Sequence, residues 1–474
     1  MNGAPSLEEA SPLDFRLKEK IHLVGVGGTG MSSIAEALVE AGFEVSGSEI
    51  KESRALNRLR KLGVKVYLGQ KASNVNDAEV ICYSTAIPNN NVELVAARNL
   101  RKKVIHRSQV LAGLSKIKKT IAVAGTHGKT TTSSMTTLSL YDSKLSPTFV
   151  IGGEVNEVGA KASFQKGDWF VVEADESDGT FLHLEVEVGV VTSIEADHLD
   201  YYGSFDALVS AYFQFLNNAK IKVISSDDEV LKNYVHENNL YSVGFNIDSD
   251  FRIGNIVESE SVNKFTLSGL FKSISDTDLT EIDLELSVLG RHNIKNASFS
   301  FIAALLAGSS IDATKNALAR FGGVSRRFEW KGIKKGITFI DDYAHLPGEI
   351  VPTIATAKLL KPKRLIACFQ PHRFSRIKSL KSSFKDSFRG ADLAIITDIY
   401  AAGEDPIQGV TAENLYNSIK EKNNDQEVLL IKSREDLISY FIKNLREGDL
   451  LLTLGAGDIT SLADEIMDEI EDEI

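Results

Sequence analysis

A short stretch at positions 124–132, AGTHGKTTT, has the residue types of a loop that binds phosphate groups. The common pattern G-x-x-x-x-G-K-[ST] would need its first glycine at position 123, where this chain has Val123, so the spacing is the shorter G-x-x-G-K-T. Backbone N–H groups of such a loop surround phosphate oxygens, while Lys129 can bind the β- and γ-phosphates and the Thr130 hydroxyl can bind Mg²⁺. With an apolar strand before it and a threonine-rich helix start after it, the stretch predicts an ATP-binding loop.

A second glycine loop lies upstream, in the stretch KIHLVGVGGTGM at positions 20–31. Its spacing is Gly25-x-Gly27-x-x-Gly30, between an apolar strand and a segment with helical spacing, which favours diphosphate binding at the start of a helix. Glu49 ends the next strand, where a dinucleotide-binding fold places the acid that binds ribose. Taken alone, this loop predicts an NAD-dependent oxidoreductase, although any nucleotide diphosphate would satisfy the same N–H groups. The alternative is a purely structural role without a ligand, in which the glycines only allow the helix and the strand to pack closely.

Two acidic clusters follow apolar strands downstream of the ATP-binding loop. Carboxylates at the C-terminal ends of parallel strands face the crevice where α/β folds bind ligands, and Mg²⁺ prefers such oxygen ligands. Most acidic clusters are solvated turns, yet two of them in the domain of a phosphate-binding loop favour a metal site, with His198 as a further ligand. The clusters are Glu173, Asp175, Glu176 and Asp178 in WFVVEADESD, and Glu195, Asp197, His198 and Asp200 in VGVVTSIEADHLDYY.

Strands and helices alternate along the whole chain, and these elements must position the two loops. Apolar strands and helical segments follow one another from Lys20, restart at 118–125, and start again after position 324. Between the last two series, residues 251–290 alternate polar and apolar types, which predicts antiparallel strands. Strands that alternate with helices predict parallel doubly wound sheets. We therefore expect an α/β protein with three domains in series, over residues 1–116, 117–323 and 324–474.

The composition excludes several other classes of protein. A chain of 474 residues with 53 basic and 65 acidic side chains has a net charge of −12, which argues against a nucleic-acid partner. Cys82 and Cys368 form no metal-binding or disulfide pattern. The polar N-terminal stretch lacks the apolar core of a signal peptide, and the apolar runs are too short to span a bilayer. We expect a cytoplasmic protein with small-molecule partners and without membrane partners.

Eight motifs in their order along the chain resemble the Mur ligases of peptidoglycan synthesis. The resemblance covers about Ile21 to Gly457 and implies a Rossmann-like domain that binds a UDP-sugar, a central P-loop domain that binds ATP, and a C-terminal Rossmann-like domain that closes over ATP and the amino acid. The first loop would then hold UDP and not NAD. The motifs are GVGGTGM, AGTHGKTTT, EADESDGTFLHL, TSIEADHLDYY, GRHNIKNA, SRRFE, DDYAHLP and QPHRFSR.

The motif forms are most similar to the branch of this family that acts on L-alanine. The resemblance implies that ATP converts the lactyl carboxylate of UDP-N-acetylmuramate into an acyl phosphate, which the alanine amine then attacks. The products would be ADP, phosphate and UDP-N-acetylmuramoyl-L-alanine. It further implies Mg²⁺, with Mn²⁺ as an alternative ion, and a monomer or a homodimer.

Roles are carried over motif by motif, and they remain implications of the resemblance. Lys129, His198 and Arg327 would be the catalytic residues, and Thr130, Glu173 and His198 would bind the metal ion. His372 belongs to a basic group expected near the sugar nucleotide and alanine. The ATP-binding set is Gly125, Thr126, His127, Gly128, Lys129, Thr130, Thr131, Asn293, Asn296, Arg327 and Asp342. The UDP-sugar-binding set is Gly25, Gly27, Gly28, Thr29, Gly30, Ser48, His345, Arg373 and Arg376.

Three positions depart from the usual family pattern. Leu346 stands where a second histidine is frequent, Ser193 where an asparagine is common, and Gln109 where a glutamate is frequent. None of these changes removes a phosphate or metal ligand.

Three other functions compete with alanine ligation. A murein peptide ligase would attach a recycled tripeptide to the same sugar nucleotide, but it usually reads EADEYD and GEHN, whereas this chain has EADESD and GRHN together with Arg373 and Arg376. An NAD-dependent oxidoreductase leaves the ATP-binding loop and both acidic clusters unexplained. A regulatory P-loop ATPase would hydrolyse ATP without an amino acid, and it gives no reason for the upstream loop.

Overall fold

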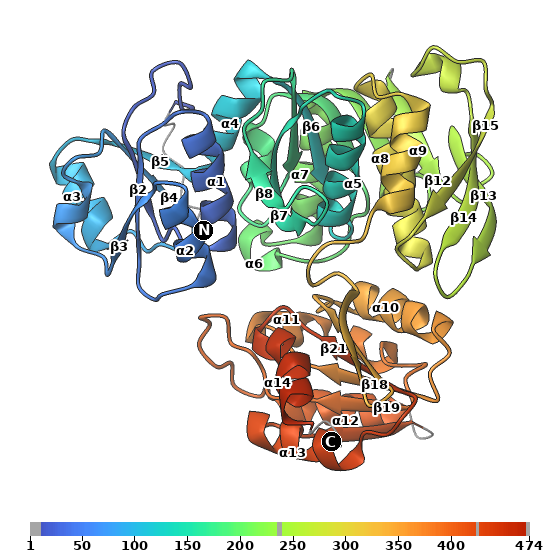
Figure 1. Cartoon of the computed structure of the whole chain (residues 1–474). Coiled ribbons are helices and arrows are strands. Elements are labelled where there is room, and N and C mark those ends of the chain that lie inside the picture. Colours follow the sequence, from blue (N-terminus) through green and yellow to red (C-terminus); the bar gives the residue numbers. More distant parts are fainter. Residues whose placement is uncertain (1–10, 235–238, 423–425, 471–474) are drawn as a thin grey trace. The chain divides into compact units, whose positions relative to one another are not determined.

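The computed structural model describes residues 11–234, 239–422 and 426–470, and the described residues form three β-sheets with helices packed against them (Figure 1). The chain divides into two compact units. The first comprises the chain up to Ile256 together with 265–285 and 295–321, and the second comprises 257–264, 286–294 and 322–474. The first predicted domain and most of the second thus fall within one unit, while residues 257–264 and 286–294 of the second predicted domain belong to the other unit. The domain limits at 116 and 323 stay predictions.

The N-terminal sheet has five described strands in the order β3-β2-β1-β4-β5, all parallel. The order places β1, with its glycine loop, at the centre of the sheet, so that the loop and helix α1 begin at the carboxyl edge of the strands. The strands are β1 Ile21–Val24, β2 Val45–Glu49, β3 Lys65–Leu68, β4 Val80–Tyr83 and β5 Lys103–His106, and the helices are α1 Thr29–Glu40, α2 Arg54–Lys61, α3 Val92–Asn99 and α4 Arg107–Ile117.

The central sheet has ten described strands in the order β15-β14-β13-β12-β11-β10-β6-β9-β7-β8. Strands β7, β9, β6, β10, β11, β12 and β13 pair in parallel, whereas β8 is antiparallel to β7. The strands are β6 Lys119–Ala124, β7 Thr148–Val155, β8 Ala160–Ser163, β9 Trp169–Glu173, β10 Val186–Val191, β11 Ala219–Ser225, β12 Leu240–Gly244, β13 Phe251–Glu258, β14 Asn263–Gly269 and β15 Glu281–Leu286. The helices are α5 Lys129–Asp142, α6 Leu199–Tyr202, α7 Phe205–Asn218, α8 Arg291–Leu306 and α9 Ile311–Arg320.

The C-terminal sheet has six described strands in the order β16-β17-β21-β18-β19-β20, parallel except for the β16–β17 pair. The strands are β16 Glu329–Lys334, β17 Ile337–Asp342, β18 Arg364–Phe369, β19 Leu393–Ile396, β20 Glu427–Leu430 and β21 Asp449–Leu454. The helices are α10 Pro347–Leu359, α11 Phe374–Leu380, α12 Ala412–Lys422, α13 Arg434–Asn444 and α14 Leu462–Glu469.

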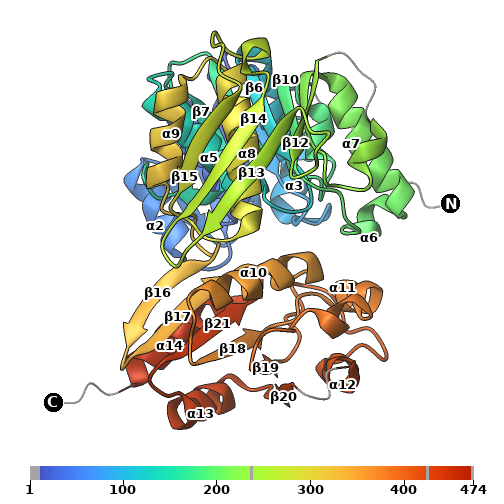
Figure 2. The same ribbon diagram turned by 90° about the vertical axis from the view of Figure 1, so that its right-hand side faces the viewer.

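Helices cover both faces of this C-terminal sheet, because successive side chains of a strand point to opposite faces. In β21, Leu450 and Leu452 belong to the core under α10, α11 and α12, whereas Leu451 belongs to the core under α13 and α14. Figure 2 shows α10 and α11 on one side of the strands and α13 on the other. Burial on both faces explains why these strands are continuous apolar runs without alternation.

Most of the strands expected from the sequence are confirmed, including the strands that precede both glycine loops and both acidic clusters. The alternating segment 251–290 forms β13, β14 and β15, and only four residues join β13 to β14, a connection that suits an antiparallel pair. No strand was expected from the sequence for β5, β7, β8, β12 and β16. β7 contains Gly152 and Gly153, and β16 contains Gly332 next to a break in its register, features that weaken a strand pattern. The other three strands have only four or five residues.

Helix α4 leads from the N-terminal sheet to β6, and its first turn depends on a histidine cap. The Nδ1 atom of His106 accepts the N–H of Ser108 at 3.3 Å, which requires that nitrogen to be unprotonated. Burial lowers the pKa of His106 to about 4, and the nearby Arg107 and His183 act in the same direction, while Asp178 opposes them. The cap is therefore complete at neutral pH.

We predict that this cap makes α4 sensitive to acid. Because the folded-state pKa lies below the ordinary value of 6.5, the stabilisation is present above pH 6.5 and is lost as the pH falls towards 4, by about 2 kcal/mol at pH 4.5. His106→Asn keeps a capping side chain that does not titrate. Hydrogen exchange of peptides from 107–117, measured at pH 7.5 and 4.5, should show a smaller acid-induced loss of protection in the variant; equal losses would contradict the cap assignment.

Candidate active site

The ATP-binding loop predicted from the sequence connects β6 to α5 through two glycines with positive φ. Gly125 has a φ of +129° and Gly128 a φ of +79°, conformations that side chains rarely adopt. A Cβ atom on Gly128 would lie 2.3 Å from Oδ1 of Asn296, so glycine also makes room for that side chain. The predicted residue Asn296 is thus brought to the loop, whereas the side chain of Asn293 donates to the carbonyl oxygen of Leu289 at 2.8 Å.

The segment that follows β10 holds this loop in place through backbone and side-chain hydrogen bonds. The N–H of Thr126 donates to the carbonyl oxygen of Ser193 at 2.9 Å, and the N–H of His127 donates to the Ser193 hydroxyl at 3.1 Å. In the other direction, the N–H of Glu195 donates to the Thr126 hydroxyl at 2.8 Å. Ser193, one of the departures from the family pattern, therefore supports the loop directly.

Lys129 lies at the start of α5 with its ammonium group surrounded by oxygen atoms. Its Nζ donates to the carbonyl oxygen of Gly125 at 2.6 Å and to Oε1 of Glu176 at 2.8 Å. Burial would lower the pKa of Lys129, but the carboxylates of Glu176 and Asp175 raise it above its ordinary value. Lys129 is therefore positively charged at neutral pH, and its charge is balanced by the Glu176 carboxylate.

The two acidic clusters lie on either side of the loop, because β9 and β10 are the neighbours of β6 in the sheet. Glu173 ends β9, and its Oε1 accepts the hydroxyl of Thr130 at 3.0 Å. After β10, Nε2 of His198 lies 3.3 Å from Oδ2 of Asp197. In the described ranges, no group of three or more His, Cys, Asp and Glu side chains is arranged to hold a metal ion. Thr130 and Glu173 are therefore brought together, and His198 is held by its own cluster.

The N-terminal glycine loop is closed by the residues that end β2. Gly25 has a φ of +72°, and its N–H donates to the carbonyl oxygen of Ser48 at 2.9 Å. The N–H of Gly27 donates to Oε2 of Glu49 at 3.0 Å, so the acid expected at a ribose binds the loop itself. The Ser48 side chain is fully buried and donates to Oε2 of Glu93, so it fixes the strand end whose carbonyl oxygen binds the loop.

In the second unit, two arginines lie against one tyrosine beside a buried aspartate. The guanidinium groups of Arg326 and Arg327 lie 4.8 and 4.9 Å from the ring centre of Tyr343. Asp342 accepts the backbone N–H groups of Phe328 and Ala344, both at 2.7 Å. Burial raises the pKa of Asp342 to about 7, against the opposing effect of Arg327 and these two hydrogen bonds.

The basic group expected from the sequence forms an aromatic cluster in the same unit. The rings of His345 and His372 have their centres 5.8 Å apart, and His372 stacks on Tyr400 at 5.6 Å. Nη1 of Arg376 donates to Nδ1 of His372 at 2.9 Å, which fixes the orientation of the imidazole. Leu346 is buried, so the residue that departs from the family pattern belongs to the core of the unit.

Three family models cover almost all of the chain. They are described as the Mur ligase family catalytic domain at residues 20–119, the Mur ligase middle domain at 123–304, and the Mur ligase glutamate ligase domain at 326–457. A UDP-N-acetylmuramate–L-alanine ligase of Pelotomaculum thermopropionicum is 39% identical over 464 residues, which cover 96% of this chain and 98% of the relative. The chain belongs to the Mur ligase family.

Two solved structures of the family resemble the fold of this chain. The UDP-N-acetylmuramate–alanine ligase MurC of Thermotoga maritima superposes with a TM-score of 0.80 at 27% identity, covering 95% of this chain and 98% of that one. A murein peptide ligase of Psychrobacter arcticus superposes with a TM-score of 0.70 at 21% identity, covering 96% and 99%. The second likeness concerns the fold alone, because both activities occur on the same Mur ligase fold.

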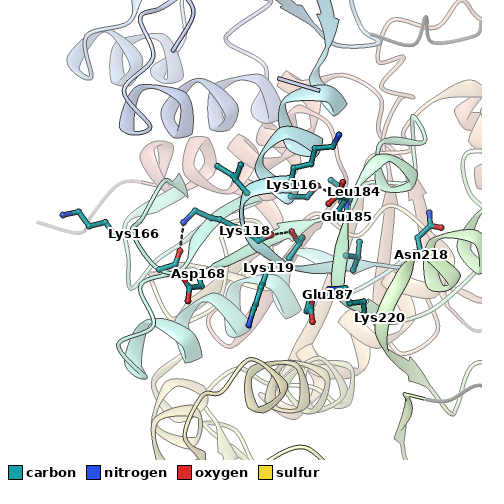
Figure 3. A pocket seen from close by; sticks show the side chains of 15 residues that line it. Lys116, Lys118, Lys119, Lys166, Asp168, Leu184, Glu185, Glu187, Asn218 and Lys220 are labelled. Atoms are coloured by element: carbon teal, nitrogen blue, oxygen red, sulfur yellow. Dashed lines mark hydrogen bonds and ion pairs between the residues drawn. The ribbon is translucent and has the colours of Figure 1, made fainter. Parts of the chain in front are cut away.

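A cavity of about 940 Å³ opens at the amino-terminal edge of the strands of the central sheet, at the opposite end of β6 from the ATP-binding loop. It is lined by the first residues of β6, β10 and β11, by residues 166–168 that precede β9, and by several lysines (Figure 3). Lys118 donates to the carbonyl oxygens of Gln165 and Gly167 at 2.9 and 2.5 Å, and Lys220 pairs with Glu187 at 2.8 Å. Ligands of α/β folds bind at the carboxyl ends of strands, so this cavity is not the site of ligation.

Sequence reasoning missed several residues that shape these sites. Tyr202 donates its hydroxyl to the backbone oxygen of Glu176, and Thr192 donates to the carbonyl oxygen of His127. Tyr343 stands within the motif DDYAHLP, which could have identified it, whereas Tyr400 lies in no motif. Of the helices in the described ranges, none combines the length and the apolar character needed to cross a bilayer.

We predict that Gly128→Ala will disable the loop beyond the cost of backbone strain. The added Cβ would lie 2.3 Å from Oδ1 of Asn296, so the loop must shift by about 1 Å to restore an ordinary contact, and a misplacement of that size should lower turnover about 100-fold. Gly159→Ala is the matched control, since Gly159 also has a positive φ of +69° but has open space around it. The control should cost about 1 kcal/mol of stability and leave turnover unchanged. Equal turnover in both variants would show that the contact with Asn296 is unimportant.

Proposed function

We propose that this chain joins L-alanine to the lactyl carboxylate of UDP-N-acetylmuramate at the expense of ATP, which forms UDP-N-acetylmuramoyl-L-alanine for peptidoglycan synthesis. The observation that carries the proposal is that one compact unit contains both a loop suited to ATP and a second glycine loop suited to a sugar nucleotide. Full-length relatives at 39% identity named for this reaction support it. The chain needs two phosphate-binding loops because two of its proposed substrates, ATP and the sugar nucleotide, carry phosphate groups.

The chemistry assigns work to the charged groups of the site. A carboxylate is a poor electrophile, so one of its oxygens first attacks the γ-phosphorus of ATP, which releases ADP and leaves an acyl phosphate. The alanine nitrogen then attacks the acyl carbon, and the tetrahedral intermediate expels phosphate. The first step brings anions together, and Lys129 and Arg327 would offset their repulsion. A dry site protects the acyl phosphate from water.

The pair Thr130 and Glu173 suits Mg²⁺, because a hydroxyl and a carboxylate 3.0 Å apart present hard oxygen ligands at the end of β9. We propose that these two residues and His198 hold the ion, with Mn²⁺ as a substitute. The ion would supply positive charge for the phosphate oxygens. Gly152 keeps the Glu173 carboxylate in place by donating its N–H to Oε2 at 2.8 Å.

The remaining predicted residues keep their proposed roles. The glycine loop of the first unit would hold the diphosphate of the sugar nucleotide through its N–H groups, with Ser48 as a buried support. In the second unit, Asp342 and Arg327 are proposed for ATP. The basic residues of that unit proposed for the sugar nucleotide and alanine are His345, His372, Arg373 and Arg376.

We propose a cytoplasmic enzyme, since ATP and nucleotide sugars are cytoplasmic metabolites, that acts as a monomer or a homodimer. The murein peptide ligase remains the alternative. It shares the fold, and the forms EADESD and GRHN together with the identity to alanine ligases favour a single amino acid over a tripeptide.

We predict that Lys129→Ala will remove nearly all turnover while UDP-N-acetylmuramate still binds. Removal of one cation that stabilises the transferring phosphoryl group should cost about 10²- to 10³-fold in kcat. The variant also leaves Glu176 buried without its cation, so Lys129→Ala/Glu176→Gln tests the same loss in a protein free of that penalty. Lys166→Ala, at the opposite edge of the sheet, is the control and should keep full turnover. Near-normal turnover in the double variant would rule out the assigned role of Lys129.

A substrate-omission experiment tests the whole proposal. Phosphate release from ATP and Mg²⁺ should require both UDP-N-acetylmuramate and L-alanine, and mass spectrometry should find a product heavier by one alanine residue. Release without either substrate would instead indicate an ATPase. Release with the tripeptide L-alanyl-γ-D-glutamyl-meso-diaminopimelate, but not with alanine, would identify the peptide ligase.

A further inference from the structure

Arg107 reaches from helix α4 to both phosphate-binding regions of the first unit. It is the first residue of α4, which leads from β5 to β6 (Figure 1). Its Nε donates to Oδ2 of Asp178 at 2.9 Å, and its Nη2 donates to Oδ2 of Asp175 at 3.0 Å. The side chain is 18% exposed and Asp178 only 2% exposed, so this ion pair is shielded from water.

The third nitrogen of the guanidinium group, Nη1, faces the N-terminal glycine loop. A Cβ atom on Gly30 would lie 2.7 Å from Nη1, so the arginine can lie this close only because the residue is glycine. Gly30 is in the first turn of α1, where backbone N–H groups and the helix dipole attract anions. Nη1 therefore adds a charged donor at the place proposed for the diphosphate of the sugar nucleotide.

Asp175 connects this arginine to the ATP-binding loop. Its Oδ1 accepts the N–H of Ser177 at 3.0 Å, while its Oδ2 is bound by Arg107. Burial raises the pKa of Asp175, but the charges of Arg107 and then of Lys129 lower it well below its ordinary value. The next residue, Glu176, accepts the Lys129 ammonium at 2.8 Å. Residues 175–178 are thus held by Arg107 at one side and by Lys129 at the other.

We propose that Arg107 is a positioning residue that couples the occupancy of the two glycine loops, an inference that rests on the function proposed above. An oxygen of the bound diphosphate accepts from Nη1 and fixes the guanidinium group. The fixed guanidinium holds Asp175 and Asp178, and with them the segment that sets the position of Lys129. Each nucleotide then binds more tightly when the other is present. The nucleotide that binds first bears the entropic cost of ordering Arg107 and residues 175–178, and the second does not bear it again.

The planar fork of arginine is essential to this coupling. Nε and Nη2 bind the two aspartates while Nη1 points to Gly30, a geometry with donors in three fixed directions. The ammonium group of a lysine keeps the charge but cannot reach all three places from a flexible chain. Arg107→Lys should therefore preserve the charge balance with Asp175 and Asp178 and lose the connection.

The experiment measures binding in place of turnover. Titration calorimetry gives the Kd of adenylyl imidodiphosphate with Mg²⁺, first alone and then with saturating UDP-N-acetylmuramate. In the unmodified protein we expect the sugar nucleotide to tighten this Kd roughly five- to tenfold. In Arg107→Lys the factor should fall towards one, with a thermal midpoint close to that of the unmodified protein.

Arg58→Lys is the matched control. Arg58 also joins the N-terminal and central sheets, since its Nε lies 3.0 Å from Oε1 of Glu36 and its Nη2 donates to the carbonyl oxygen of Gly159 at 3.2 Å, but it contacts neither loop. The control should keep the full factor. A factor unchanged in Arg107→Lys, a factor of one in the unmodified protein, or an equal loss in Arg58→Lys would each overturn the coupling. Failure of UDP-N-acetylmuramate to bind the unmodified protein would instead refute the proposed function.

Discussion

Lys129 lies in the first unit with its ammonium group surrounded by protein, and a buried cation is stable only where carboxylates and carbonyl oxygens replace water. Glu176 and the carbonyl oxygen of Gly125 do so here, and Asp175 adds a second negative charge nearby. Much of the local structure follows from this need. The loop must turn so that its carbonyl groups meet the ammonium, which requires glycine at two positions, and the segment after β9 must bring its carboxylates to the same point.

The order of strands in the central sheet satisfies that need. Since β9 and β10 flank β6, the acidic segments that follow them approach the loop from both sides, although they are far from it in the sequence. Ser193 and Thr126 then join the loop to β10, and Thr130 joins it to Glu173 at the end of β9. The site proposed for phosphoryl transfer thus lies where three neighbouring parallel strands end at one edge of the sheet.

Charge balance extends from this loop to the N-terminal sheet. Arg107 neutralises Asp175 and Asp178, and its position at the start of α4 places it between the two sheets of the unit. Without such a cation, several buried carboxylates would repel one another and would also repel ATP. The same arrangement suits the proposed ligation of two anionic substrates, because each phosphate group would find N–H groups and a cation already in place.

Local sequence patterns were enough to predict which segments carry the chemistry and most of the strands before them. A glycine loop, a lysine and a threonine at fixed spacing have one common use, and a continuous apolar run before them is typical of a buried parallel strand. The order of eight motifs was enough to indicate the Mur ligase family, which the family models and full-length relatives confirm. These signals are local, so they can be read without knowing which segments are neighbours in space.

Which side chains contact one another depends on the tertiary structure and could not be predicted from the motifs. Three contacts depend on the strand order of the two sheets. Glu176 binds Lys129, the Ser193 hydroxyl accepts the N–H of His127, and Arg107 lies against Gly30. Ser48 shows the same limit, because its place in a motif does not reveal that its hydroxyl is buried against Glu93. Contacts between residues far apart in the chain arise from packing, and periodicity and spacing contain no information on how separate elements pack.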